Sequence, residues 1–122
     1  MASMLNNPAA VRNVSAYIAS MPETAAAETI TGNEANGRRI YRANCAACHG
    51  QDGNGSWATG APNLTADDWY TARQIINFKS GVRGAHTDDF YGRQMMSMST
   101  AMHGEQETND VISYINSLKQ TQ

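Results

Sequence analysis

The sequence predicts an all-α fold, because apolar residues recur at helical spacing in four segments. Three of these segments are preceded by residues that can cap a helix. No alternation of apolar and polar residues is long enough to predict a useful strand. The stretches between the segments are rich in glycine, asparagine and aspartate, which favour loops. The helices are expected over residues 8–20, 33–49, 68–80 and 105–118.

The first helix is predicted from its two ends. Asn7 can cap it, Pro8 suits the first helical position, and Pro22 stops it. Residues 21–32 combine proline and glycine with alanine, glutamate and threonine, and are interpreted as a linker. The helix carries one apolar stripe, formed by Val11, Val14, Tyr17 and Ile18.

The second helix should begin at Asn33, within a capping box over residues 31–34, and run into a pair of cysteines. Gly37 is unusual in a helix interior, where glycine costs roughly 1 kcal/mol relative to alanine. On or near one face of this helix lie Ile40, Tyr41 and Cys45.

The third helix is predicted to be capped by residues 65–68 and ended by Gly81. Residues 50–66 and 82–104 are predicted as loops. The expected apolar stripe of the third helix consists of Trp69, Ala72 and Ile76, with Tyr70 and Phe78 beside it. The last helix is expected to bury Val111, Tyr114, Ile115 and Leu118.

Residues 45–49 read Cys-Ala-Ala-Cys-His, the attachment pattern of a c-type haem. Two thiols one helical turn apart can form thioethers with the two vinyl groups along one side of a porphyrin. The imidazole that follows then lies under the ring and can ligate the iron. We therefore expect Cys45 and Cys48 to bind a haem covalently and His49 to ligate its iron.

Three other interpretations of this motif are open. A thioredoxin-like redox pair lacks a βαβ setting. A zinc site lacks a second cysteine pair, because the chain has only two cysteines. A disulfide across two intervening residues would constrain very little chain. Haem attachment is favoured over all three.

The other axial position of the iron needs a second ligand, and a cluster of methionines offers candidates. A thioether favours ferrous iron and raises the reduction potential, which suits electron transfer. Met95 is favoured by its position, followed by Met98 and then Met96. His86 and His103 are the alternatives. The cluster spans eight residues and consists of Met95, Met96, Met98 and Met102.

The second ring nitrogen of a ligating histidine usually donates to a carbonyl or carboxylate. Pro62 lies on a loop that could pass beside His49, and its carbonyl lacks competing local partners. We expect that carbonyl to accept the hydrogen bond.

Charge and hydropathy argue against two classes of partner. The net charge of -2 and the pI of about 5.8 disfavour nucleic acid. No apolar run is long enough to cross a membrane. The first residues lack the charged-then-apolar pattern expected of a signal peptide, whereas covalent haem is expected outside the cytoplasm. We therefore expect a piece of a longer protein, located in the periplasm of a bacterium.

The chain also contains a short internal repeat. Residues 14–18 (Val-Ser-Ala-Tyr-Ile) align with residues 111–115 (Val-Ile-Ser-Tyr-Ile). We interpret residues 1–20 as the remnant last helix of a preceding unit, residues 21–32 as a linker and residues 33–122 as an intact domain. The apolar stripe of the first helix should pack on this domain or on a second chain, which would make a dimer.

Together these segments resemble a class I cytochrome c. The matching residues are 45–50, 62–64, 70–81, 92–95 and 110–115, and the resemblance covers residues 33–119. Two groups are especially similar to this chain. One is the second unit of tandem di-haem cytochromes c, and the other is the cytochrome domains fused to subunit II of bacterial haem-copper oxidases.

The resemblance implies an all-helical domain around one covalent haem. Its first and last helices would cross near a glycine and an aromatic pair, so that Gly37 and Tyr41 would meet Tyr114. Pro62 and Leu64 would contact the haem.

The resemblance also bears on the second axial ligand. In the di-haem cytochromes c the ligand methionine stands seven residues before the apolar residue that opens the last segment. That residue is Met102 here, which points to Met95.

These expectations describe a single-electron carrier with one haem c per chain and no catalytic residue. It would exchange electrons with redox proteins, within a parent protein attached to the inner membrane. The alternative is a haem enzyme or sensor with a labile sixth ligand, either peroxidase-like or gas-binding. A zinc- or disulfide-bearing interaction module is the alternative outside the haem class.

Overall fold

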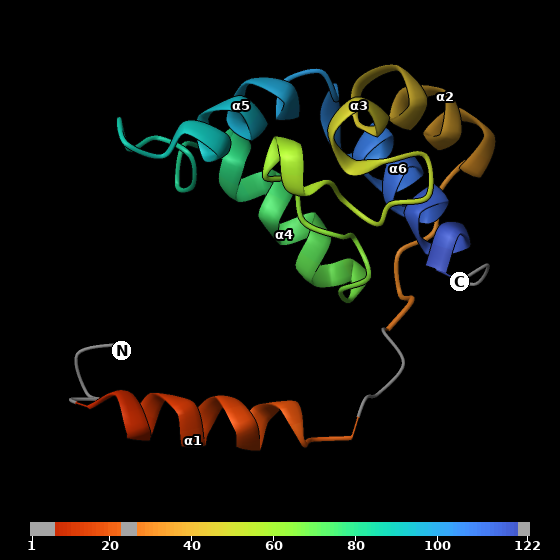
Figure 1. Cartoon of the computed structure of the whole chain (residues 1–122). Helices are drawn as coiled ribbons and strands as arrows, with labels where there is room; N and C mark the ends of the chain where they lie inside the picture. The colour runs from red at the N-terminus through yellow and green to blue at the C-terminus, as the bar shows by residue number, and fades with distance from the viewer. Residues whose placement is uncertain (1–6, 23–26, 120–122) are drawn as a thin grey trace.

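The computed structural model describes residues 7–22 and 27–119 (Figure 1). Within these ranges the chain is helical, and its sheet-like pairing is limited to an isolated bridge between Ser56 and Ala61. The predicted all-α fold is confirmed. In chain order the elements are α1 (Pro8–Ala19), α2 (Glu34–Asn44), α3 (Ala46–His49), the 3₁₀ turn η2 (Trp57–Thr59), α4 (Asp68–Lys79), α5 (Phe90–Ser99) and α6 (Gly104–Lys119).

Helices α2 and α6 cross in direct contact and form the centre of the core (Figure 1). The rings of Tyr41 and Tyr114 meet edge to face, with centroids 5.3 Å apart, as the resemblance implied. For Gly37, the nearest atoms to an added Cβ are backbone atoms of α6, rather than the ring of Tyr114 that the resemblance implied. The added Cβ would come within 1.9 Å of the carbonyl oxygen of Asp110. Gly37 therefore allows the two backbones to approach at the crossing.

Apolar side chains from α2, α4 and α6 pack around this crossing. The predicted stripe of α6 is confirmed, because Val111, Tyr114 and Ile115 are buried and Leu118 packs against the core. The buried apolar residues of this core are Ile40, Tyr41, Ala46, Ile75, Met102, Val111, Ile112, Tyr114 and Ile115.

The predicted apolar stripe of α4 is only partly buried, since Phe78 is buried and Ala72 packs against the core. Trp69 and Ile76 are 56% and 50% exposed. Helix α4 carries apolar residues on two sides, so the spacing alone does not select one. The buried carboxylate of Asp68 selects the other side, because it accepts hydrogen bonds from the backbone of residues 29 and 30. The buried face consists of Asp68, Thr71, Ile75 and Phe78.

The predicted loop over residues 82–104 is also partly wrong, because residues 90–99 form α5. Asp89 caps this helix by accepting from the backbone N–H of Gly92, 2.8 Å away. Gly92 and two serines weaken the local helix signal. The methionine cluster therefore lies mostly on a helix, so its members point in different directions.

Part of the predicted linker is attached to the domain. Asp67 accepts from the N–H of Ala27 at 2.7 Å, and Asp68 accepts from the N–H of Ile30 at 2.6 Å. Asp110 accepts from the N–H of Asn33, also at 2.7 Å. Residues 27–33, here called the strap, thus lie along α4 and α6. Asn33, rather than Thr31 of the predicted capping box, caps α2. Its side chain accepts from the N–H of Asn36.

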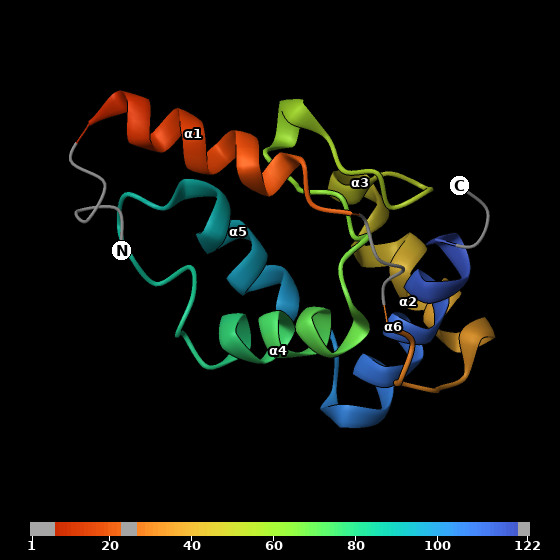
Figure 2. The ribbon, with the colours of Figure 1, turned by 90° about the horizontal axis from the view of Figure 1, so that it is seen from below.

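Helix α1 lies apart from the helices of the domain (Figure 1), and in the view from below it is seen in front of them (Figure 2). Asn7 caps it and Pro8 occupies its first position, as predicted. Its stripe faces solvent, since Val11, Val14, Tyr17 and Ile18 are all exposed. Packing of this stripe on the domain is therefore not observed in the described residues, and packing on a second chain stays a prediction. Among those residues no helix has the length and apolar character needed to cross a membrane.

Candidate functional site

A mostly apolar cavity of about 440 Å³ lies between α3, the loop that follows it, α4, α5 and α6. Its size is within the range of cofactor sites in proteins. The predicted site residues all line it, namely Cys45, Cys48, His49, Pro62, Leu64 and Met95. The fold thus gathers on one cavity residues that are up to fifty positions apart in the chain.

The cysteine pair lies where α2 gives way to α3. The N–H of Cys45 still donates to Tyr41, as in a continuous helix, and the N–H of His49 donates to the carbonyl of Cys45 at 2.9 Å. One helical turn therefore separates the two thiols and places the imidazole directly after them. Both thiols are half-buried and free, so no disulfide joins them.

The thiol of Cys45 differs from that of a thioredoxin-like pair. Burial raises its pKa to about 11, and the neighbouring Cys48 adds to this effect. Reactive dithiols instead have a lowered pKa, because the thiolate is the nucleophile. The described residues also contain no β-strand that could supply the expected setting for such a pair.

His49 is held in one orientation. Only 8% of the residue is exposed, and its Nδ1 donates to the carbonyl oxygen of Pro62 at 2.9 Å. This is the hydrogen bond predicted from the sequence. Since Nδ1 carries the proton, Nε2 keeps its lone pair and is available to a metal in the cavity.

A glycine that the sequence analysis did not single out makes this hydrogen bond possible. Gly55 has φ of +80°, and a Cβ added there would lie 2.5 Å from the carbonyl oxygen of Ala61 and 2.6 Å from the carbonyl carbon of Pro62. Its N–H donates to the carbonyl of His49 at 2.8 Å. Only glycine lets the segment around residue 55 approach the backbone of residues 61–63 so closely.

Two further polar contacts hold the loop in place and were also missed. The hydroxyl of Thr59 donates to the carbonyl of Cys48 at 3.0 Å. The hydroxyl of Tyr41 donates to the carbonyl of Gly50 at 2.8 Å. Both partners are backbone oxygens beyond the range of helical hydrogen bonds, so sequence spacing gives no signal for either contact.

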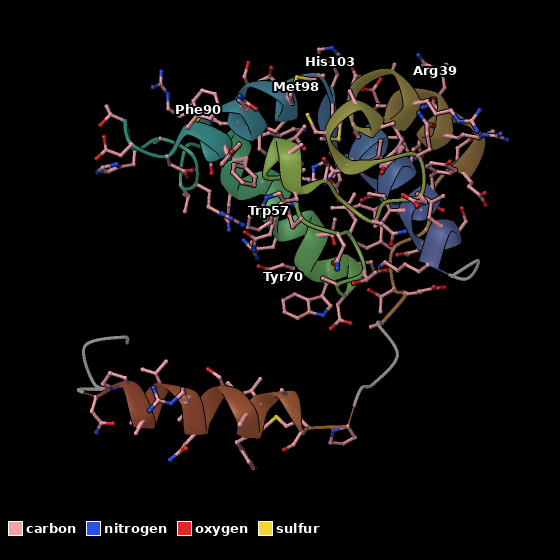
Figure 3. The ribbon with its side chains drawn as sticks, viewed as in Figure 1. Arg39, Trp57, Tyr70, Phe90, Met98 and His103 are labelled. Carbon is pink, nitrogen blue, oxygen red and sulfur yellow. The ribbon has the colours of Figure 1, made fainter. Side chains whose placement is uncertain are left out.

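The four methionines of the cluster differ in whether they line the cavity. Met95 and Met98 are three residues apart on α5 and both line the cavity, as does Met102. Met96 is not among the lining residues. Met102 is buried in the core and Met98 is 41% exposed, whereas Met95 is half-buried on the cavity wall. Figure 3 shows Met98 at the outer side of α5.

The two histidines considered as alternatives lie elsewhere. His86 is exposed and its Nδ1 faces Asp88. His103 is exposed just before α6 (Figure 3). Neither lines the cavity. The geometry therefore gives no support to a second imidazole ligand.

The residues around the cavity fit a haem c. Two free thiols stand one turn apart, a histidine presents its second ring nitrogen, and a thioether comes from another wall. The remaining walls are mainly apolar. A zinc site does not fit, because within the described residues no three His, Cys, Asp or Glu side chains are grouped to hold a metal ion.

Comparison with known proteins identifies the family. The model of the family described as "Cytochrome c" matches residues 34–119. This chain belongs to the cytochrome c family. Its expected cofactor is therefore haem c, and the helical fold and the class I resemblance agree with this membership.

The curated relatives of this cytochrome c are oxidase subunits. The cbb3-type cytochrome c oxidase subunit CcoP of Rhodobacter capsulatus is 36% identical over 90 residues, covering 67% of this chain and 28% of the relative. Subunit FixP of the cbb3-type oxidase of Bradyrhizobium diazoefficiens is 34% identical over 88 residues, covering 69% of this chain and 30% of the relative.

A shorter match is closer in sequence. Subunit CcoP of Cereibacter sphaeroides is 60% identical over 35 residues, covering 29% of this chain and 12% of the relative. The cytochrome c thus spans less than a third of the length of these curated relatives. No solved structure matched it with significance.

Proposed function

We propose that this cytochrome c carries single electrons through one covalently attached haem c, ligated by His49 and Met95. The observation that carries the proposal is the arrangement of His49. Its Nδ1 is bound to the carbonyl of Pro62, and its other nitrogen is left for a cavity that also receives two free thiols.

When bound, the haem supplies a one-electron change of oxidation state at its iron. The residues of the chain hold and shield it. Cys45 and Cys48 fix the porphyrin, and the carbonyl of Pro62 keeps the imidazole of His49 in one tautomer. Leu64 packs between the cavity and the core and excludes water. No side chain is required to act as an acid, base or nucleophile.

Met95 is proposed as the second axial ligand because of its place on α5. It lies on the cavity side and is less exposed than Met98, whereas Met96 is outside the lining. A soft thioether favours ferrous iron and raises the reduction potential. This choice favours an electron carrier over the alternative, a haem enzyme or sensor with a labile sixth ligand.

Covalent attachment is tested on matured protein. A pyridine haemochrome spectrum recorded after denaturation should show haem c, and acidified organic solvent should not extract the pigment. Replacing both cysteines, as Cys45→Ala with Cys48→Ala, should abolish covalent retention. Colourless wild-type protein, or pigment released into the solvent, would overturn the proposal.

The ligand is tested by substituting each methionine in turn. Met95→Ala should lose the ferric charge-transfer band of the thioether–iron bond and lower the reduction potential. Met96→Ala and Met98→Ala serve as matched controls and should keep both properties. A high-spin spectrum in the wild-type protein would favour the labile-ligand alternative.

We further propose that the domain belongs to the electron-entry part of a respiratory oxidase. The support is similarity to CcoP and FixP subunits of cbb3-type oxidases. Its donor and acceptor would then be redox proteins. Its location would be the periplasm, in a parent protein attached to the inner membrane.

The internal repeat supports a proposal about residues 1–20. Val14, Tyr17 and Ile18 of α1 correspond to Val111, Tyr114 and Ile115 of α6, which are all buried against other helices. We propose that α1 is the last helix of a preceding cytochrome unit. Its stripe would lie on a second chain and make a dimer.

A further inference from the structure

Three exposed aromatic side chains lie around the cavity at places that the haem site does not require. Trp57 on η2 is 100% exposed, and Phe90 and Tyr91 at the beginning of α5 are also exposed (Figure 3). We call these three residues, together with Gly60, the aromatic rim. Large apolar groups gathered on a surface often mark a site of protein contact.

Gly60, Tyr91 and Phe90 contact one another in sequence, and Trp57 projects freely from the turn that contains Gly60. The N–H of Gly60 donates to the carbonyl of Trp57 at 3.2 Å, which closes the η2 turn. The ring of Tyr91 lies on Gly60, where an added Cβ would be 2.7 Å from ring atoms. Phe90 meets Tyr91 edge to face, with centroids 5.4 Å apart. Gly60 and Tyr91 also line the cavity.

The rim is directly coupled to the haem-attachment segment. Thr59 lies inside the η2 turn, and its hydroxyl donates to the carbonyl of Cys48 at 3.0 Å. A protein that covers Trp57 would therefore rest over the turn that holds the second attachment cysteine. The hydrogen bond from Thr59 to Cys48 thus links the surface turn η2 directly to the haem-attachment segment.

The segments that form the rim carry almost no charge. Residues 53–66 contain no Asp, Glu, Lys or Arg, and residues 90–103 contain only Arg93. The flanking carboxylates are engaged locally, since Asp52 accepts from Asn54 and Asp89 accepts from Gly92. The other nineteen Asp, Glu, Lys and Arg residues of the chain thus lie outside these two segments.

From these observations we infer that the aromatic rim is the surface on which the redox partner docks, and that the partner is a protein with an uncharged, apolar docking face. Trp57 is the anchor, because an exposed tryptophan can fill a pocket on a partner and dominate the contact. Docking by apolar contact does not depend on charge steering, so its rate should be insensitive to salt. This inference rests on the proposed electron-carrier function.

A second copy of the holoprotein is a suitable probe, because its own rim is uncharged and apolar. Electron self-exchange is measured by NMR line broadening in mixtures of oxidised and reduced protein. Between about 0.01 M and about 1 M salt, the Debye length falls from about 30 Å to about 3 Å. Over this range the rate should change by less than about twofold.

Trp57→Ala should slow self-exchange by about tenfold while leaving the absorption spectrum and reduction potential unchanged. Trp69→Ala is the matched control, because it removes an exposed tryptophan from α4, outside the rim. Its self-exchange should equal that of the wild type. A Trp57→Ala rate equal to that of the wild type would overturn the inference.

A charge placed on the rim gives an independent test. Ala58→Glu on the exposed η2 turn should slow self-exchange at low salt, and high salt should restore the rate. Ala35→Glu adds the same charge at an exposed position of α2 and should not change the rate. Equal behaviour of the two variants would contradict docking on the rim.

The two proposals fail differently. Protein without covalent haem, or haem that does not cycle between oxidation states, contradicts the electron-carrier function itself. Protein that cycles normally, but exchanges electrons at a strongly salt-dependent rate that Trp57→Ala does not affect, contradicts only the rim.

Discussion

Gly37 shows how much a single missing methyl group can decide. A Cβ at this position would overlap the carbonyl oxygen of Asp110, at 1.9 Å, and that oxygen belongs to the backbone of α6. Backbone cannot rotate away as a long side chain can, so an added methyl group must separate α2 from α6. The edge-to-face pair of Tyr41 and Tyr114 lies one helical turn further along the same crossing. It would separate with the helices.

We therefore predict that Gly37→Ala lowers the free energy of unfolding of the holoprotein by at least about 3 kcal/mol. Gly81→Ala is the control, because Gly81 has φ of +71° but nothing within 4 Å of an added Cβ. It should lose only about 1 kcal/mol from backbone strain. Denaturant unfolding measures the free energy of unfolding of both variants. Equal decreases in the two would contradict close packing as the reason for Gly37.

At the scale of elements, the first turn of α4 determines how the strap is held. The carboxylate of Asp68 is fully buried and accepts from the N–H of Thr29 and of Ile30. Burial alone would raise its pKa, but these hydrogen bonds outweigh burial and hold the pKa of Asp68 below its usual range. The charged form is therefore favoured in the folded protein.

The lowered pKa gives a pH dependence with a definite sign. The contribution of Asp68 to stability is present above the unfolded pKa of about 3.9 and is lost as pH falls through the lower folded pKa. Asp68→Asn keeps the shape but removes the charge, so the hydrogen bonds that it accepts from the backbone N–H groups become weaker. At pH 7 it should lower the free energy of unfolding by about 2 kcal/mol.

Denaturant unfolding at several pH values checks this prediction. The difference between wild type and Asp68→Asn should shrink as the pH falls below about 4. Asp88→Asn is the control, since the side chain of Asp88 is 89% exposed, and it should match the wild type throughout. A difference that stays constant with pH would show that the charge of Asp68 is not the cause.

On the scale of the whole molecule, the strap limits where α1 can go. Residues 27–33 are attached by three carboxylates, those of Asp67, Asp68 and Asp110. The chain that leads from α1 is therefore held beside the first turn of α4, where Asp67 accepts from the N–H of Ala27. A helix with four exposed apolar residues gains stability by covering them.

Removing residues 1–22 tests whether a second chain covers that stripe. The full chain should sediment as a dimer and the shortened chain as a monomer, since the strap and the haem cavity remain intact. Replacing Tyr17 and Ile18 together by serine should have the same effect without shortening the chain. Unchanged assembly and unchanged melting in both variants would contradict the proposed dimer.

Local signals in the sequence were enough to predict the haem-attachment motif and the positions of most helices. The spacing of Cys45, Cys48 and His49 is local, because one helical turn sets the distance between neighbouring groups. Capping residues and apolar periodicity are also local signals, and they predicted α1, α2 and α6 to within a few residues. Even the hydrogen bond from His49 to Pro62 could be predicted, because the two residues are only thirteen positions apart in the chain.

The tertiary structure alone decided which side of each helix is buried and which groups meet at the cavity. Asp68 turned α4 by making contacts with residues nearly forty positions earlier in the chain. Formation of α5 placed Met95 and Met98 on the cavity and Met96 outside its lining. These outcomes depend on contacts between distant segments, whose free energy exceeds local preference and leaves no trace in local sequence spacing.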